Sequence, residues 1–143
     1  MALRTLTPEL LAFLEEMRVP GVLSTLGVHG EPISSAVWYG LHEGAIILAT
    51  PATRNKARNV RNDPRVSFLV DTKERPYSGV AIEGEAEVIE DPDLELMFSI
   101  ARRYLGDELP DWVRERYASN ERVVIRITAR RVRPWNIPLP EPQ

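Results

Sequence analysis

The residues best suited to chemistry stand where an apolar run passes into a basic segment. This stretch, LATPATRNKARNVRNDPRV from Leu48 to Val66, carries hydroxyls, amides and several cations. Thr50 ends the apolar run, and Thr53 is placed to cap the helix that follows. The free N–H groups and the positive dipole end of such a helix favour an anion. The junction therefore predicts a phosphate-binding site.

The predicted helix carries two rows of donors. Lys56 and Asn59 are three residues apart and can share one face, while Arg58 and Arg61 form a second row at the same spacing. Donors of three shapes open the helix: Arg54, Asn55 and Lys56. We expect one row to hold phosphate and the other a longer anionic tail. A solvated basic helix with a threonine cap would contain the same residues, so that alternative stays open.

The charge distribution favours a small anionic ligand over a nucleic acid. The net charge of the chain is −3 and its isoelectric point is about 5.5, yet residues 53–65 hold five cations against one anion. Proteins that bind nucleic acids usually show a broad basic face, and stacking platforms for single strands need a row of surface aromatics. We therefore expect no nucleic-acid partner.

A second candidate surface is the apolar segment 33–39. Small residues precede a bulky aromatic pair in it, in the order Ser34, Ser35, Ala36, Val37, Trp38 and Tyr39. Small side chains let backbone amides approach and hydrogen-bond the heteroatoms of a planar ring. An ordinary barrel strand with Trp38 in the core is the alternative. Trp38, Tyr39 and Trp135 are candidates for the wall of a substrate pocket, although core or dimer packing is equally compatible with them.

The elements that must position these residues follow from periodicity and turn signals. Thr7 and Pro8 begin a predicted amphipathic helix that ends at Val19. Strands are predicted at 22–26, 33–41, 45–50, 65–71, 80–88, 123–129 and 132–135, and further helices at 91–106 and around 112–117. Many short strands with hairpin spacing predict a mainly β (α+β) antiparallel barrel of six to seven strands, with an N-terminal helix and two or three inserted helices. We expect one domain over 1–143, with a proline-rich tail at 138–143.

Several kinds of site and location are not expected. The chain has no cysteine, which excludes disulfides and thiolate chemistry and fits a reducing, cytoplasmic location. His29 and His42 fall in predicted turns, and Asp91 and Asp93 form a helix start, so we expect no metal site. No stretch resembles a signal peptide or the roughly 20 apolar residues of a membrane span. We therefore expect no membrane association.

The order of these pieces resembles the pyridoxamine 5′-phosphate oxidase-like split β-barrel superfamily. The resemblance rests on VLSTLGVHGEPISSAVWYG at 22–40, the strand ending LAT, TRNKARNVRNDPRVSFLV at 53–70 and IEGEAEVIED at 82–91. Two later motifs, RRYLG at 102–106 and RVRPW at 131–135, are similar to the subgroup of deazaflavin-dependent oxidoreductases.

The resemblance implies a homodimer of split barrels that holds a flavin or deazaflavin at the subunit interface. The phosphate-binding lysine of the family falls on Lys56, the phosphate turn on Arg54 and Asn55, and the residue near the ribityl chain on Thr50. The ring-facing strand falls on residues 34–38. A contribution from the partner subunit falls near two loop residues, Tyr77 and Ser78.

The chain also departs from the family pattern. Flavin-bound relatives commonly carry an arginine on the ring-facing strand, where this chain has Ser34 and Ser35, and this weakens the case for tight binding of flavin mononucleotide (FMN). The longer C-terminal extension that completes the substrate site of the vitamin B6 oxidases is also missing. We therefore do not expect vitamin B6 oxidation.

With these residues, the resemblance implies an oxidoreductase that transfers a hydride from the reduced 8-hydroxy-5-deazaflavin coenzyme F-420 to a small organic acceptor. The cofactor supplies the reactive carbon in such chemistry, so no catalytic side chain is expected. The coenzyme continues beyond its phosphate into a lactyl oligoglutamate tail, which four cations could match: Arg54, Lys56, Arg58 and Arg61. Two alternatives stay open, an FMN-binding oxidoreductase of the same fold and a non-catalytic carrier or sensor.

Overall fold

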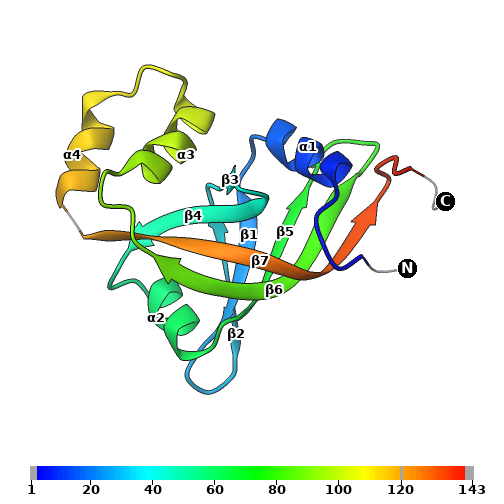
Figure 1. The fold of residues 1–143 in the computed structure, drawn as a ribbon, viewed down its shortest axis with the longest axis horizontal. Coiled ribbons are helices and arrows are strands. Elements are labelled where there is room, and N and C mark those ends of the chain that lie inside the picture. The colour runs from blue at the N-terminus through cyan, green and yellow to red at the C-terminus, as the bar shows by residue number, and fades with distance from the viewer. Residues whose placement is uncertain (1–2, 120, 141–143) are drawn as a thin grey trace.

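The computed structural model describes residues 3–119 and 121–140, which form four helices and seven strands (Figure 1). In chain order they are α1 (Pro8–Glu16), β1 (Gly21–Leu26), β2 (Pro32–Val37), β3 (Gly40–His42), β4 (Ala45–Pro51), α2 (Asn55–Asn62), β5 (Arg65–Asp71), β6 (Gly79–Ile89), α3 (Glu95–Leu105), α4 (Asp111–Ser119) and β7 (Arg122–Trp135). This architecture confirms the predicted fold class. Of the predicted tail, 138–140 has no helix or strand, and 141–143 lies outside the described residues.

The strands form one antiparallel sheet in the order β2, β1, β5, β6, β7, β4, β3. The sheet curls into a half-barrel around the long strands β6 and β7 (Figure 1). A bulge between Glu83 and Gly84 shifts the register of this pair and helps the strands to bend. A Cβ at Gly84 would lie 2.4 Å from the Thr128 carbonyl oxygen, so the position requires glycine.

Helix α1 covers the apolar interior of the half-barrel. Thr7 caps it as predicted, because its Oγ1 accepts a hydrogen bond from the Leu10 N–H at 3.3 Å. Leu10 and Leu14 are completely buried, and they join a core that includes Leu23, Phe68 and other inward-facing strand residues. Burial of this helix face is the main force that holds α1 on the sheet.

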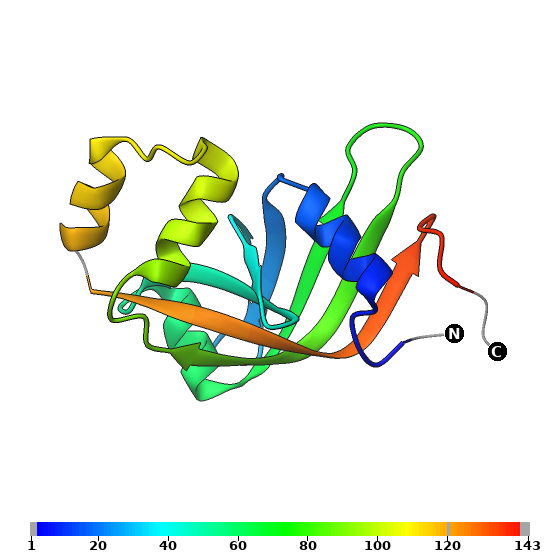
Figure 2. The ribbon, with the colours of Figure 1, turned by 45° about the horizontal axis from the view of Figure 1, so that its top comes forward.

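Helices α3 and α4 lie together at the end of the molecule where β7 begins (Figures 1 and 2). Ile47 and Val124 on the outer face of β4 and β7 pack with Met97 and Ile100 of α3 in a second apolar cluster. The Asp91 carboxylate accepts hydrogen bonds from two N–H groups at the start of α3, Leu96 at 3.2 Å and Met97 at 3.0 Å. Asp91 is thus part of a helix start, as its position in the sequence predicts.

Two of the predicted strand boundaries are wrong. The strand predicted over 33–41 is divided into β2 and β3, because Tyr39 turns into the core and is 0% exposed. Its hydroxyl lies 2.7 Å from both the Leu14 and the Met17 carbonyl oxygens, so it can donate to either. The strands predicted at 123–129 and 132–135 form the single strand β7, in which the bulge accommodates Arg130.

Candidate functional site

A pocket with a volume of about 480 Å³ lies where the ends of β2 and β4 and the start of α2 meet helices α3 and α4. β2 is one edge strand and β4 lies next to the opposite edge, so the curl of the sheet brings their ends together. The lining residues are Ala36, Val37, Trp38, Ala49, Thr50, Pro51, Arg54, Lys56, Ile100, Trp112, Arg116, Tyr117 and Arg122.

The two regions that the sequence singles out meet in this pocket. The junction between β4 and α2 provides Thr50, Arg54 and Lys56, and the segment at the end of β2 provides Ala36, Val37 and Trp38. Thr50 is only 3% exposed, whereas Trp38 is 36% exposed. The pocket therefore offers cationic donors at one side and an aromatic ring beside a strand at another.

The charges that line the pocket are all positive. Its cations are Arg54, Lys56, Arg116 and Arg122, and no carboxylate is among its described lining residues. Burial lowers the pKa of the Lys56 ammonium, and the charge of Arg54 lowers it further. Burial also lowers the pKa of the Arg122 guanidinium, with added effects of Arg116 and Arg54. An anion in this pocket would relieve the repulsion.

Two aromatic side chains support the arginines from α4 and β7. The Arg122 guanidinium carbon lies 4.8 Å from the centroid of the Tyr117 ring, and that of Arg116 lies 5.8 Å from the Trp112 ring. The buried Nε of Arg122 has no hydrogen-bond partner within the described part of the chain. Such an unpaired buried donor fits a site that receives an acceptor from a ligand.

Sequence reasoning missed the four residues that α4 and β7 contribute to the pocket: Trp112, Arg116, Tyr117 and Arg122. The only local signal is the spacing of Trp112 and Arg116, four residues apart on the predicted short helix. Their distance in sequence from the basic segment gives no hint that they face it.

Trp38 is held in place by the RRYLG segment of α3. The Trp38 and Tyr104 rings stack with centroids 4.9 Å apart and an angle of 8° between their planes. The Tyr104 hydroxyl donates to the Val19 carbonyl oxygen at 3.0 Å and accepts from the Tyr39 N–H at 3.3 Å. α3 thus fixes one wall of the pocket and also contacts the segment after α1.

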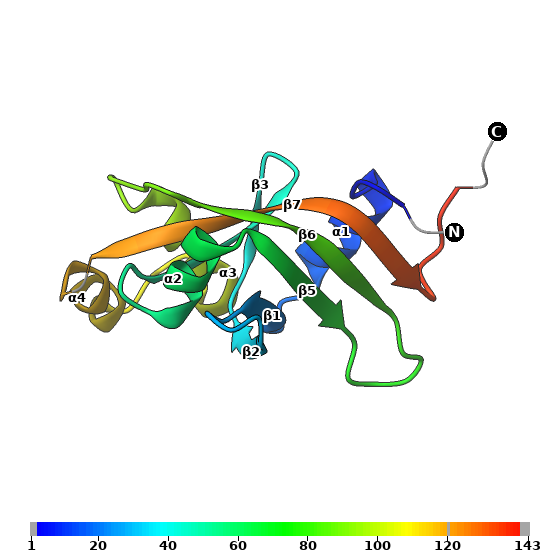
Figure 3. The ribbon, with the colours of Figure 1, turned by 90° about the horizontal axis from the view of Figure 1, so that it is seen from below.

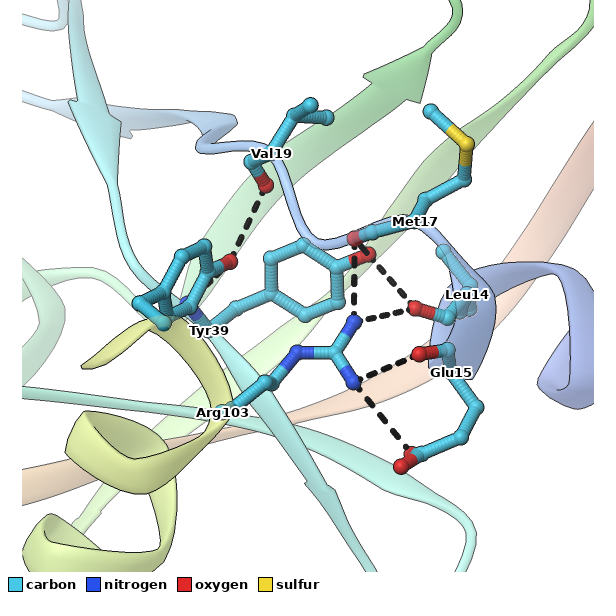
Figure 4. Close-up of polar contacts among 7 residues, drawn as sticks. Leu14, Glu15, Met17, Val19, Tyr39 and Arg103 are labelled. Carbon is cyan, nitrogen blue, oxygen red and sulfur yellow. Dashed lines mark hydrogen bonds and ion pairs between the residues drawn. The ribbon is translucent and has the colours of Figure 1, made fainter. Parts of the chain in front are cut away.

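The neighbouring Arg103 binds the C-terminal end of α1 (Figure 4). It donates to the carbonyl oxygens of Leu14, Glu15 at 2.8 Å and Met17 at 3.0 Å. Its guanidinium carbon lies 4.7 Å from the centroid of the Tyr39 ring. Burial raises the pKa of the Tyr39 phenol to about 12, so this hydroxyl stays protonated and remains a donor.

Three predicted residues of the basic helix lie outside the pocket lining. Thr53 does not cap the helix, which is a correction: α2 begins at Asn55 after Arg54, and no side chain caps it. Asn55 is exposed. The buried amide of Asn59 donates to the Thr25 hydroxyl at 3.0 Å and so ties α2 to β1. Asn59 therefore does not share a ligand-facing row with Lys56, because it faces the sheet.

The predicted second row, Arg58 and Arg61, also lies away from this pocket. Arg58 is exposed. Arg61 donates to the Ala52 carbonyl oxygen at 3.1 Å and lines a separate cleft of about 730 Å³. That cleft includes Glu87, Glu90, Asp91 and Glu121, so its rim would repel a polyanion. Arg122 lines both cavities.

The substrate-wall prediction is wrong for Tyr39 and unsupported within one chain for Trp135. Tyr39 is buried in the core, where its ring packs edge-on against Phe68. Trp135 lies against Gly79 at the end of β7 opposite to Arg122 and the pocket. Ser34 and Ser35 do not line the pocket, and the Ser34 hydroxyl lies 2.9 Å from that of Ser24.

Tyr77 and Ser78 lie in the connection between β5 and β6, which projects from the molecule at the end away from α4 (Figure 3). Tyr77 is 52% exposed, and the Ser78 hydroxyl donates to the Asn136 carbonyl oxygen at 2.9 Å. These residues are therefore remote from the pocket of their own chain. Their predicted role through a partner subunit stays a prediction.

No helix in the described ranges has the length and apolar character needed to cross a membrane. Within the same ranges, no group of three or more histidine, aspartate or glutamate side chains is arranged to hold a metal ion.

Solved structures share this fold. A conserved hypothetical protein from Mycobacterium tuberculosis is 34% identical, with a TM-score of 0.79 over 98% of this chain and 94% of that one. An F-420 reductase is 23% identical, with a TM-score of 0.71 over 85% and 94%. A candidate pyridoxamine 5′-phosphate oxidase from Listeria innocua is also 23% identical, with a TM-score of 0.67 over 90% and 96%.

The sequence pattern of a known family covers nearly the whole chain. The model of the N-terminal pyridoxamine 5′-phosphate oxidase domain matches residues 6–136, from just before α1 to just after β7. This match includes all the elements that build the pocket. The chain therefore belongs to the pyridoxamine 5′-phosphate oxidase family.

Proposed function

We propose that this protein is an oxidoreductase that binds a phosphorylated flavin-type cofactor in the cationic pocket. The cofactor is the deazaflavin coenzyme F-420, and its reduced form gives a hydride to a small organic acceptor. The observation that carries the proposal is a pocket lined by four cations and no carboxylate, next to the exposed face of Trp38. The F-420 reductase fold and the family match support the same class of cofactor.

The residues present fit the phosphate of such a cofactor. Lys56 and Arg54 stand at the junction of β4 and α2, where a phosphate would raise the lowered pKa of Lys56. The Thr50 hydroxyl, which makes no hydrogen bond to any described residue, adds a donor beside them. The backbone at Ala36 and Val37 and the indole of Trp38 are available to the ring. When bound, the cofactor supplies the hydride-carrying carbon.

The chain then binds and orients the cofactor and excludes water from it. The cations fix the phosphate end, while the stacked pair of Trp38 and Tyr104 provides a rigid apolar wall for the ring or its acceptor. No proton-transfer side chain is required of the pocket. We place the cofactor at the interface of a homodimer, in which Tyr77 and Ser78 of the partner subunit approach the ring, because family members are commonly dimeric.

One observation favours the FMN alternative. Arg58 and Arg61 do not line the pocket, so the basic row expected to follow the tail of F-420 is not there. FMN ends at its phosphate and needs only Arg54 and Lys56.

The two cations from α4 and β7 argue for the longer coenzyme, because FMN would leave them without a partner.

A titration distinguishes these cofactors. Purified protein is titrated with F-420 and with FMN by fluorescence quenching, at low and at high salt. We expect F-420 to bind more tightly and to lose more affinity in salt, because its tail adds screened ion pairs. Tighter binding of FMN with little salt dependence would identify FMN, and not F-420, as the cofactor.

The phosphate site is tested with Lys56→Ala. We expect affinity for either cofactor to fall about tenfold or more, because a charge-assisted hydrogen bond contributes about 1.5–3 kcal/mol. Arg58→Ala is the matched control, since it removes an exposed cation of the same helix outside the pocket. Equal affinities of Lys56→Ala and the unaltered protein would refute the phosphate site.

Turnover separates an enzyme from a carrier. Reduced F-420 bound to the protein is mixed with small acceptors such as quinones and enones, and the return of the oxidised absorbance is followed. Acceleration over the free coenzyme supports the oxidoreductase. Tight binding that leaves every acceptor unreduced would identify a carrier or sensor.

A further inference from the structure

The pocket holds more positive charge than one phosphate neutralises. Arg54 and Lys56 lie at the junction of β4 and α2, whereas Arg116 and Arg122 come from α4 and the start of β7. A phosphate that is esterified on two sides carries a single negative charge. If Arg54 and Lys56 bind it, the other two cations still lack an anion.

No carboxylate in the described part of the chain supplies that anion. None of these four cations forms an ion pair with a described residue, and no acidic side chain is among the lining residues. The buried Nε of Arg122 also has no acceptor within the described chain. Like charges gathered without a counterion cost free energy, so the cluster is best explained by a ligand with more than one anionic group.

The cluster has two parts, because two of its cations come from the junction of β4 and α2 and the other two from α4 and β7. Arg54 lowers the pKa of both Lys56 and Arg122, and Arg116 also lowers that of Arg122. The charges of the two parts of the pocket are therefore close enough to interact. A ligand that neutralises both parts must extend from the phosphate toward α4.

The part from α4 and β7 suits carboxylates. Tyr117 and Trp112 lie against the guanidiniums of Arg122 and Arg116, which limits their motion. A planar guanidinium binds a carboxylate through two parallel hydrogen bonds.

We propose that Arg116 and Arg122 form a second anion subsite that binds a carboxylate of the cofactor beyond its phosphate. The proposal rests on the function proposed above and deepens it, because this subsite selects an F-420-type cofactor with an acidic tail over FMN. In this proposal, Arg116 of α4 and Arg122 of β7 bind the anionic tail that the sequence assigned to Arg58 and Arg61.

The test compares two ligands on matched variants of the full-length protein. Arg116→Gln changes an exposed residue of the pocket rim, and Arg58→Gln changes an exposed arginine outside it. Each variant is titrated with F-420 carrying its glutamate tail and with FMN, and thermal unfolding confirms that it is folded. Lys56→Ala is measured in parallel.

We expect Arg116→Gln to lower the affinity for F-420 about three- to tenfold, as for the loss of a partly exposed ion pair of about 1 kcal/mol. The affinity for FMN should stay unchanged. Arg58→Gln should change the affinity for neither ligand. Arg116→Lys should recover part of the lost affinity, because the charge returns without the bidentate geometry. Arg116→Gln should also reduce the salt dependence of F-420 binding but not that of FMN.

The outcomes separate this proposal from the proposed function. If Lys56→Ala lowers the affinity for both ligands while Arg116→Gln changes the affinity for neither, the second subsite is overturned and the phosphate site stands. Equal losses for F-420 and FMN in Arg116→Gln would also overturn it, because the contact would then involve a part that both ligands share. If Lys56→Ala has no effect while Arg116→Gln weakens F-420 alone, the phosphate site fails and the carboxylate subsite stands.

Discussion

At the scale of single residues, Lys56 is a partly buried cation without a carboxylate partner among the described residues, as we expect of a ligand-binding side chain. Its ammonium is half-buried, it lines a pocket of like charge, and its pKa is lowered from 10.5 by burial first and by Arg54 second. Between this lowered value and 10.5 the unfolded chain binds more protons than the folded one. The free protein should therefore gain stability as pH rises through that window.

Cofactor affinity should have the opposite pH dependence. A bound phosphate favours the charged ammonium, so binding is strongest below the lowered pKa of Lys56 and falls as pH rises through it. Titrations at a series of alkaline pH values measure this fall.

Lys56→Arg is the control for this pH dependence, because arginine keeps its charge throughout the range. Its affinity should stay level where that of the unaltered protein declines. The same decline in Lys56→Arg would assign the titration to another group.

At the scale of elements, the contact between α1 and α3 links the core to the pocket. Arg103 binds the carbonyl oxygens at the end of α1 (Figure 4), and the adjacent Tyr104 stacks on Trp38. The last carbonyls of a helix have no partner within the helix, so donors from α3 satisfy them. The side chain of Arg103 is only 7% exposed, which makes water a poor replacement.

Arg103→Met should lower the free energy of unfolding by about 2–4 kcal/mol, because it removes a charged donor from buried carbonyl oxygens and keeps most of the side-chain volume. Chemical denaturation measures this change. Arg102→Met alters the exposed neighbour on the same helix and should stay within about 0.5 kcal/mol of the unaltered protein. A similar small loss for Arg103→Met would show that the clamp adds little stability.

At the scale of the whole molecule, we expect two chains to build each cofactor site. Tyr77 is exposed in the connection between β5 and β6, which lies at the end of the molecule away from α4 (Figure 3). Lys56 lines the pocket to which α4 contributes. Light scattering should give about twice the 16.2 kDa mass of one chain.

A mixing experiment tests this shared site. Lys56→Ala and Tyr77→Ala should each bind F-420 weakly, and a mixture that exchanges subunits should recover tight binding in a fraction of its sites. Recovery is expected because one site of each mixed dimer has both native residues. A monomer that binds F-420 tightly, or a mixture without recovery, would contradict a site built from two subunits.

The local elements were predictable because they depend on neighbours in the sequence. Thr7 with Pro8 marks the start of α1, and the alternation of Glu83 and Glu85 with small residues marks β6. The junction of β4 and α2 was also recognisable, and it brings Thr50, Arg54 and Lys56 into one pocket.

Long-range packing decided what local patterns could not. Helical spacing puts Asn59 on the same face as Lys56, yet Asn59 turns to Thr25 because α2 must bury one side against the sheet. The position of Tyr39 beside Trp38 in the sequence suggests a pocket residue, but its hydroxyl hydrogen-bonds to carbonyl oxygens at the end of α1. Such partners lie far away in sequence and are visible only after folding.

By itself, the sequence determined a small antiparallel barrel and the basic turn at 53–56, since hydrophobic period and turn residues act over a few positions. Only the tertiary structure decided which cations share a pocket. It separates Arg58 and Arg61 from Lys56 and brings Arg116 and Arg122 to it, because the curl of the sheet and the docking of α3 and α4 place distant segments side by side. Charge in a sequence can be counted, but its concentration around a ligand depends on the fold.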